Sequence, residues 1–286
     1  MSESQIKIGV DFRGDLFYVA RVDYSGGRPE VKALFRLEKQ HLGQHHLLEG
    51  GQLILSVPDS EIILKRLNLN GSAGDIETRA RFELVHTLME DEDRFYFDII
   101  PTGKESAYLG LILRKERLES FLDKLLDQRR SFFAQSGYRT RAAALADGYI
   151  NFCRLTGGDL ICLADFMGQS ASMAFVYRNK IIDLTHMSLK RFDLTTTAGV
   201  GKMCVELKTL VNFKVAALFN EGISTPLSAM LLSGDTVTEQ DSQIMKRYFP
   251  VEIITPTVNS GFFNGQADLT DVPLEKYIVA LGLAAN

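Results

Sequence analysis

Two short segments of the chain share a pattern that could do chemistry, an apolar run followed by an aspartate and a glycine. The first closes with Asp11–Gly14 (Asp-Phe-Arg-Gly) and the second with Asp165–Gly168 (Asp-Phe-Met-Gly). A carboxylate at the end of a strand, beside the exposed N–H groups of a glycine turn, can hold a hydrated Mg²⁺ together with phosphate oxygens. The two aspartates are therefore candidate Mg²⁺ ligands, and the two glycines are candidate phosphate-binding turns.

Each Asp-Phe-x-Gly segment also fits an ordinary hairpin turn, because aspartate and glycine are common turn residues. Both segments nevertheless follow the first strand of an alternating series that opens one half of the chain. This equivalent placement favours an internal duplication of the fold. It favours nucleotide binding much less, so both interpretations of the turns stay open.

Alternating apolar and polar residues predict an antiparallel sheet at the start of the chain. Its strands are expected at residues 5–12, 15–23 and 30–37. A strand at 53–57 then extends this first sheet and is closed by a turn at Pro58 and Asp59, and another alternating run follows at 62–69.

The next segment, residues 75–125, has helical spacing of apolar residues at its two ends and alternation between them. This order of helix, two strands and helix predicts a compact α+β subdomain. A helix rich in small residues is then expected at 142–152. The turn at 156–159 (Thr-Gly-Gly-Asp) is expected to divide two lobes.

The second half of the chain begins with another meander. Three strands joined by tight turns are expected at 159–166, 171–178 and 180–186. The remaining elements are expected to be a helix at 196–215, a strand at 229–233, a helix at 238–248, a strand at 251–254 and a final helix started by Asp271 and Pro273. We therefore divide the chain into a first lobe (1–72), an inserted subdomain (73–140), an interlobe helix and linker (141–158) and a second lobe (159–286).

The composition argues against several function classes. The net charge is −4 and the charges are interspersed, so the chain lacks the basic stripe that binds nucleic acid. No stretch approaches the roughly 20 apolar residues of a membrane-spanning helix, and the amino terminus does not resemble a signal peptide. We expect a cytoplasmic protein with no membrane span of its own. Cys153, Cys162 and Cys204 are expected to be buried thiols.

Two other patterns suggest chemistry but have simpler explanations. Ala198–Lys202 resembles the end of a P-loop, yet a threonine replaces its first glycine and a methionine follows its lysine. A helix start capped by a threonine is expected there. His41, His45 and His46 lack an acidic or cysteine partner at metal-binding spacing, so a solvated loop or short helix is expected.

The order of elements resembles the actin-like ATPase superfamily, and within it the PilM family of cytoplasmic type IV pilus assembly proteins, relatives of FtsA. The resemblance covers nearly the whole chain. The segments that carry it are Ile8–Asp11, Leu55–Ser60, Ile62–Leu67, the α+β insert, Leu163–Asp165, Leu231–Gly234 and Tyr277–Ala284. It implies an α/β, ribonuclease H-like fold with duplicated mixed sheets in two lobes. The first lobe then corresponds to actin-like subdomain 1A, the insert to 1C, and the second lobe to 2A with a reduced 2B.

In this superfamily two phosphate hairpins and an adenosine strand surround a nucleotide. The resemblance therefore implies ATP or ADP with Mg²⁺ as cofactors, or no cofactor if the site is degenerate. The implied nucleotide site consists of Asp11, Gly14, Asp165, Gly168, Ser233 and Gly234, with Mg²⁺ held by Asp11 and Asp165.

Several positions depart from the family pattern. The family turns read Asp-Ile-Gly-Ser or Asp-Ile-Gly-Gly, whereas Arg13 and Met167 occupy the glycine position here, which hinders close backbone approach to phosphate. Asp235 stands in the glycine-rich adenosine turn, and the acidic position of the interlobe helix falls near Ala144 and Ala146. The residues expected to support hydrolysis are therefore not conserved from the family pattern, and we expect a pseudo-ATPase or weak ATPase.

The resemblance implies a scaffold of a type IV pilus or related secretion apparatus, peripheral at the inner membrane through a partner. In the PilM family, a groove between the first lobe and the inserted subdomain captures a short cytoplasmic peptide of a membrane-anchored protein. The matching region here is formed by residues 53–69 and 75–126. An alternative is an ATP-dependent small-molecule kinase or other active ATPase of the superfamily, and a third is a filament-forming actin relative.

Overall fold

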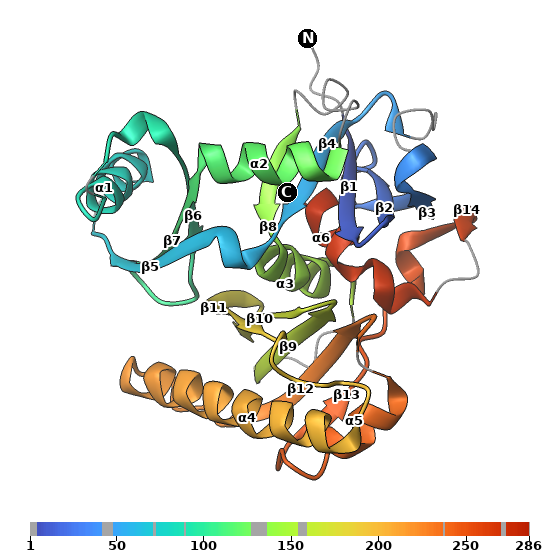
Figure 1. Cartoon of the computed structure of the whole chain (residues 1–286). Coiled ribbons are helices and arrows are strands. Elements are labelled where there is room, and N and C mark those ends of the chain that lie inside the picture. Colours follow the sequence, from blue (N-terminus) through green and yellow to red (C-terminus); the bar gives the residue numbers. More distant parts are fainter. Residues whose placement is uncertain are drawn as a thin grey trace.

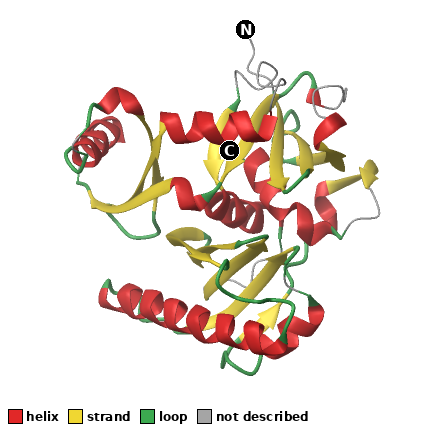
Figure 2. Cartoon of the chain, in the orientation of Figure 1, coloured by secondary structure: helices red, strands yellow, loops and turns green. Residues whose placement is uncertain are grey.

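The computed structural model describes residues 5–41, 48–70, 73–88, 90–126, 136–153, 159–236, 238–269 and 273–285. Figure 1 shows two sheet-containing lobes, one above the other, with a small subdomain beside the upper lobe. Figure 2 shows that helices lie between the two large sheets and on their outer sides.

The first large sheet contains six strands in the order β14-β3-β2-β1-β4-β8. β1, β2 and β3 form an antiparallel meander, β4 and β8 continue the sheet parallel to β1, and β14 is parallel to β3. The strands are β1 (Ile6–Arg13), β2 (Leu16–Asp23), β3 (Glu30–Glu38), β4 (Gln52–Val57), β8 (Gly137–Thr140) and β14 (Phe263–Leu269).

The second large sheet repeats this plan in the order β11-β10-β9-β12-β13. Its first three strands again form an antiparallel meander, and its last two again run parallel to the first strand. The strands are β9 (Leu160–Met167), β10 (Ser170–Tyr177), β11 (Lys180–Ser188), β12 (Leu227–Gly234) and β13 (Glu252–Ile254). β9 therefore corresponds to β1, β12 to β4 and β13 to β8, which confirms the predicted duplication.

The inserted subdomain is a three-stranded antiparallel sheet in the order β5-β7-β6. Helix α1 (Ala73–Val85) packs on this sheet and closes a small core of its own. Helix α2 (Lys115–Leu126) instead turns its buried leucines toward the outer face of the first large sheet. The strands are β5 (Ile62–Asn68), β6 (Phe95–Pro101) and β7 (Ala107–Arg114).

Two helices, α3 (Arg141–Phe152) and α6 (Ile278–Ala284), lie between the two large sheets (Figure 1). They cross at very short range. A Cβ built on Gly282 would lie 1.7 Å from the carbonyl oxygen of Ala144, and a Cβ on Gly148 would lie 1.9 Å from that of Ile278. The small residues of both helices therefore allow the backbones to touch, and they join the two lobes through one shared core.

The outer face of the second sheet is covered by α4 (Thr197–Asn220) and α5 (Glu239–Met245). Helix α4 extends five residues beyond the predicted end at 215. Its cap is Thr196, whose side chain accepts the N–H of Gly199, so the expected threonine cap is confirmed. Among the described residues, none of the helices is both long enough and apolar enough to cross a membrane.

The predicted fold class, an actin-like α/β architecture with an inserted α+β subdomain, is confirmed. The three cysteines are buried and free. The predicted domain boundaries stay a prediction, and β14 pairs with β3 of the first sheet. His45, His46, the turn residues 156–158 and Asp271 lie outside the described residues.

Candidate functional site

The two Asp-Phe-x-Gly segments form equivalent hairpin turns. Gly14 follows β1 with φ of +64°, and Gly168 follows β9 with φ of +52°, a backbone region that glycine enters without strain. Asp11 and Asp165 occupy matching positions on β1 and β9, and both carboxylates are fully buried. The duplication therefore places one buried aspartate in each lobe.

Each aspartate also accepts a hydrogen bond from a serine on the neighbouring parallel strand. The Oγ atom of Ser56 on β4 donates to Oδ1 of Asp11 at 3.1 Å. The Oγ atom of Ser233 on β12 donates to Oδ1 of Asp165 at 2.8 Å. Since β4 and β12 are equivalent strands, the Asp–Ser pair is part of the repeated plan.

Arg141, the first residue of α3, connects the two aspartates. Its Nε atom donates to Oδ2 of Asp165 at 2.7 Å, and its Nη2 atom donates to Oδ2 of Asp11 at 2.9 Å. Its Nη1 atom also donates to Oδ1 of Asp11 and, at 3.2 Å, to the carbonyl oxygen of Phe12. The guanidinium thus binds Asp11 through two nitrogens and Asp165 through the third, a strong, charge-assisted geometry.

Arg13 supplies a second buried guanidinium from the first hairpin. Its Nε atom donates to Oδ2 of Asp11 at 3.0 Å, and its Nη2 atom lies 3.4 Å from Oδ1 of Asp165. Nη2 also donates to the carbonyl oxygen of Lys276 at 2.9 Å. The guanidinium carbon is 4.9 Å from the ring centroid of Tyr18, so an aromatic face supports it.

Asp11, Asp165, Arg13 and Arg141 together form what we call the interlobe cluster. A chain of charges continues from this cluster toward solvent. Nη1 of Arg13 lies 3.5 Å from Oδ2 of Asp235, and Nζ of Lys276 lies 3.0 Å from Oδ1 of the same aspartate.

The interlobe cluster is electrically balanced, with two positive and two negative side chains. Burial alone would raise the pKa of Asp165, but the charges of Arg141 and Arg13 outweigh burial and lower this pKa to about 2. Burial likewise opposes the charge of Arg141, yet Asp11 and Asp165 raise its pKa above the ordinary arginine value. Asp165 and Arg141 therefore stay ionised at neutral pH.

Mg²⁺ does not fit between the two aspartates in this arrangement. All four carboxylate oxygens already accept hydrogen bonds from Ser56, Ser233, Arg13 or Arg141. Mg²⁺ needs such oxygens at about 2.0–2.1 Å and brings its own water molecules, whereas two guanidinium groups fill the space. Within the described residues, no group of three or more His, Cys, Asp or Glu side chains could hold a metal ion elsewhere.

The start of helix α3 is also satisfied from within the protein. The N–H of Ala142 donates to both carboxylate oxygens of Asp59 at 3.1 and 3.2 Å, and the N–H of Ala143 donates to Thr140 at 3.2 Å. Asp59 is buried, and burial raises its pKa above the usual value. A helix start is a common anion-binding site, but these two N–H groups are already engaged.

The six predicted nucleotide-binding residues lie in three places. Asp11, Asp165 and Ser233 come together in or beside the interlobe cluster. Gly14 and Gly168 lie in turns where an added Cβ would meet no heavy atom within 4 Å. A nucleotide-binding role for these residues stays a prediction.

Gly234, the sixth predicted residue, lines a cavity of about 620 Å³ at the end of β12, together with Asp235, Thr238, Lys246 and Lys276. Its φ is +109°, and a Cβ there would lie 2.0 Å from the carbonyl oxygen of Phe166. The close packing of Gly234 against β9 is therefore enough to require glycine at this position, whether or not a nucleotide binds.

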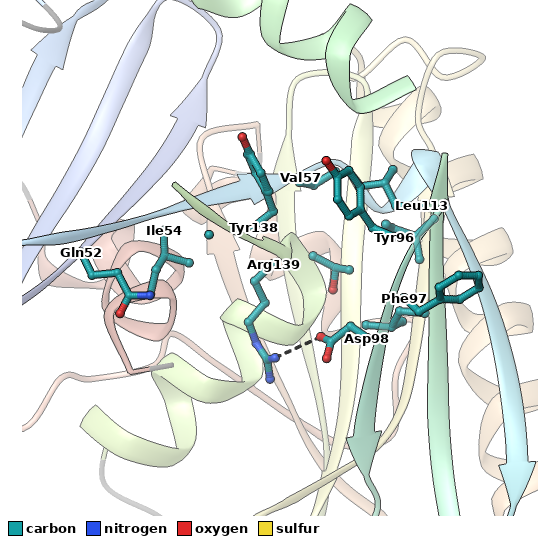
Figure 3. A pocket seen from close by; sticks show the side chains of 13 residues that line it. Gln52, Ile54, Val57, Tyr96, Phe97, Asp98, Leu113, Tyr138 and Arg139 are labelled. Atoms are coloured by element: carbon teal, nitrogen blue, oxygen red, sulfur yellow. Dashed lines mark hydrogen bonds and ion pairs between the residues drawn. The ribbon is translucent and has the colours of Figure 1, made fainter. Parts of the chain in front are cut away.

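A second concave region, which we call the groove, lies between the first large sheet and the inserted subdomain (Figure 3). Its volume is about 410 Å³. Strand β8 forms the edge of the first sheet here, and β6 forms an edge of the small sheet. Most lining side chains are apolar or aromatic, and Gln52, Asp98 and Arg139 add polar groups. The groove is lined by Gln52, Ile54, Val57, Ile62, Tyr96, Phe97, Asp98, Leu111, Leu113, Gly137, Tyr138, Arg139 and Thr140.

Arg139 connects the two walls of the groove. Its Nη1 atom lies 3.5 Å from Oδ2 of Asp98 in the subdomain, the contact drawn in Figure 3. Its Nε atom donates to Oδ2 of Asp147 on α3 at 2.6 Å. Only one residue separates Arg139 from Arg141, so a short stretch of chain links the groove to the interlobe cluster.

Sequence reasoning missed Arg141, Ser56 and Asp59. It noted the bulk of Arg13 in the phosphate turn but did not use its charge. The available signal was an arginine at the start of a helix otherwise rich in alanine and expected between two lobes. Such a charge is almost never fully buried unless it is paired, which pointed to a nearby carboxylate.

Two sheets that share five equivalent strands in the same order, joined by two central helices and each carrying a buried aspartate near the end of its first strand, define an actin-like ATPase fold. A solved structure described as the PilM-PilN type IV pilus biogenesis complex is similar in fold, with a TM-score of 0.69 and 15% sequence identity over 97% of this chain and 97% of that chain. A Bacteroides thetaiotaomicron protein of actin-like ATPase fold and unknown function gives a TM-score of 0.54 and 10% identity over 97% and 96% of the two chains.

The cytoplasmic domain of EpsL, an inner membrane component of the type II secretion system of Vibrio cholerae, gives a TM-score of 0.47 and 11% identity over 97% and 94% of the two chains. No protein-family model matches this chain, and no curated protein matches its sequence. At these identities, the likeness to PilM shows a common fold.

Proposed function

We propose that this protein is a cytoplasmic assembly scaffold of a type IV pilus or related secretion apparatus. In this proposal it binds a cytoplasmic segment of a membrane-anchored partner and is peripheral at the inner membrane through that partner. The observation that carries the proposal is the groove between the first sheet and the inserted subdomain, in a chain whose fold resembles that of PilM in the PilM-PilN complex over nearly its full length.

The chemistry of the groove suits a short extended peptide. Its floor includes Ile54, Leu111 and Leu113, which can receive apolar side chains. Strands β8 and β6 are sheet edges, and such edges can pair with the backbone of an added strand. Arg139 and Asp98 at the wall supply a cation and a carboxylate for polar groups of the same peptide.

In this proposal the protein acts by recognising its partner in the groove, and its nucleotide cleft is degenerate. Both aspartates that would hold Mg²⁺ are neutralised by arginines of the same chain. Peptide capture in the groove therefore needs no hydrolysis. The remaining cavity beside Gly234 does not restore the missing metal site, since it lies outside the paired carboxylates.

The test is direct binding of labelled peptides, measured by fluorescence anisotropy. The peptides are the cytoplasmic terminal segments of single-span pilus and secretion proteins from the same host. We expect one or more to bind at micromolar concentration, and we expect Tyr96→Ala, at a half-exposed groove residue, to weaken binding about tenfold. The matched control is Phe213→Ala, which removes an exposed aromatic ring from α4, outside the groove. Equal binding by both variants, or binding by no peptide, would count against the proposal.

The competing proposal is an ATP-dependent small-molecule kinase or another active ATPase of the superfamily. The observation in its favour is the pair of facing aspartates beside a cavity of about 620 Å³. It requires both arginines to leave the carboxylates before Mg²⁺ can bind. Release of phosphate or ADP from ATP by the purified protein, abolished by Asp11→Asn, would favour this alternative.

A further inference from the structure

We infer that Arg13 and Arg141 take the place of a Mg²⁺ ion between the lobes, so that the protein holds its two lobes together with its own side chains and without a bound cation. The inference concerns the interlobe cluster and does not depend on what the groove binds. It explains why two arginines are buried where two aspartates meet.

The first supporting observation is that each arginine contacts both lobes. Arg141 belongs to α3, yet it binds Asp11 of the first lobe and Asp165 of the second with one guanidinium. Arg13 belongs to the first lobe and reaches Asp165 of the second. Each arginine therefore bridges the lobes, as a cation shared between two carboxylates would.

The second observation is the charge balance. A doubly charged cation between two aspartates would give a neutral site, and two guanidinium groups give the same neutrality. Arg13 and Arg141 are only 2% and 4% exposed in their side chains, so solvent ions do not supply the compensation. Since a buried, unpaired carboxylate is strongly unfavourable, the arginines are required as long as the aspartates are present.

The third observation is the difference between the duplicated hairpins. Arg13 and Met167 occupy equivalent positions, but only Arg13 contributes a positive charge to the cluster. Tyr18 on the neighbouring strand supports the guanidinium of Arg13. The second positive charge comes from Arg141 of α3 instead. The two arginines are therefore far apart in the sequence but meet in the interlobe cluster.

A second ionic contact joins the lobes at a distance from the cluster. Arg66 of the inserted subdomain and Lys214 of α4 both lie 3.0 Å from Oδ2 of Asp183, a buried residue of β11. The subdomain is thus tied to the second lobe while the cluster ties the first lobe to it.

The test begins with calorimetric titration of the full wild-type chain with Mg²⁺, Mg²⁺–ATP and Mg²⁺–ADP, and with its melting temperature in each. We expect no heat of binding and no shift of the melting temperature at millimolar ligand. Micromolar binding of Mg²⁺–ATP that is lost in Asp11→Asn would overturn the inference.

The second arm uses variants. Arg13→Gly/Arg141→Ala restores the glycine of the family turn and leaves both aspartates uncompensated, so we expect a lower melting temperature that Mg²⁺ partly restores. Arg141→Lys keeps the charge but replaces a three-nitrogen fork with a single donor group; we expect it to fold, to melt several degrees lower, and to remain insensitive to Mg²⁺–ATP. A wild-type melting temperature in Arg141→Lys would contradict the inference even if the double variant fails to fold.

Discussion

Arg141 compensates the charge of two buried carboxylates, because its guanidinium binds Asp11 and Asp165 at once. Taking four charges out of water costs a large desolvation energy, which the mutual attraction of the group offsets only while every member is present. Removing one member therefore does more than delete its own contacts. It leaves an unpaired charge in a site closed to water.

We expect Arg141→Met to lower the free energy of unfolding by about 3–5 kcal/mol, because the side chain keeps its bulk while the aspartates lose their shared cation. Urea unfolding followed by circular dichroism measures this change. The matched control is Arg191→Met, which removes an ion pair between Arg191, 67% exposed in its side chain, and Glu206, and should cost less than about 1 kcal/mol. Equal losses for the two variants would show that the cluster contributes no more than a surface pair.

The pKa of Asp165 gives a pH dependence with a definite sign. Burial raises this pKa, and the arginines lower it further than burial raises it, so the folded value is about 2 against an ordinary value of 3.8. A carboxyl with a lower pKa in the folded state stabilises the fold above its unfolded pKa and loses that contribution as it is protonated. The free energy of unfolding should therefore fall as the pH drops from about 4 to about 2. Asp165→Asn should show a shallower fall over this interval, and an unchanged slope would contradict the assignment.

At the scale of elements, the close crossing of α3 and α6 fixes how the lobes meet. Glycine and alanine line both helices where they touch, and Gly9 of β1 packs against α6 in the same way, since a Cβ there would lie 1.9 Å from the carbonyl oxygen of Ala280. Arg141 sits at the first turn of α3, so this crossing also positions the guanidinium between the two sheets.

We expect Gly282→Ala to destabilise the protein by about 3 kcal/mol or more, because the new methyl group would lie 1.7 Å from the backbone oxygen of Ala144. Helix propensity alone would make the alanine variant more stable than the wild type. A loss of stability would therefore show that the close packing outweighs helix propensity. Gly26→Ala is the control, because a Cβ there meets no heavy atom within 4 Å and its φ is not in the left-handed region. Thermal unfolding should show little change for the control; a similar melting temperature for both variants would argue against the close crossing.

The strands and the duplication were predictable from the sequence because alternation and turn residues are local signals. The repeated Asp-Phe-x-Gly segments predicted that each lobe would carry one aspartate at the end of its first strand. The pairing of β14 with β3 was not predicted, since its residues are separated by more than two hundred positions and carry no special pattern. Nor was the partnership of Arg141 with Asp11, 130 residues away. Both depend on how the elements pack.

At the scale of the whole molecule, the lobes are connected by the shared helical core, by the interlobe cluster and by the contacts of Asp183. The groove borders the shared core through Ile54 and Leu111, and its lining residues Arg139 and Thr140 directly precede Arg141 of the cluster. The proposed scaffold is therefore a recognition surface on a two-lobed body whose lobes are joined by contacts within the chain. Its shape should not change with nucleotide, in contrast to an ATPase that closes on its substrate.

The most direct measurement observes the two guanidinium groups by nuclear magnetic resonance. The Nε–H groups of Arg13 and Arg141 both donate to buried carboxylates, so their signals should be protected from exchange with water at neutral pH and assignable with Arg13→Lys and Arg141→Lys. We expect both signals to persist, at unchanged positions, when millimolar Mg²⁺–ATP is added. If Mg²⁺–ATP shifted both signals or made them exchange rapidly, the arginines would not occupy the place of Mg²⁺ between the two aspartates.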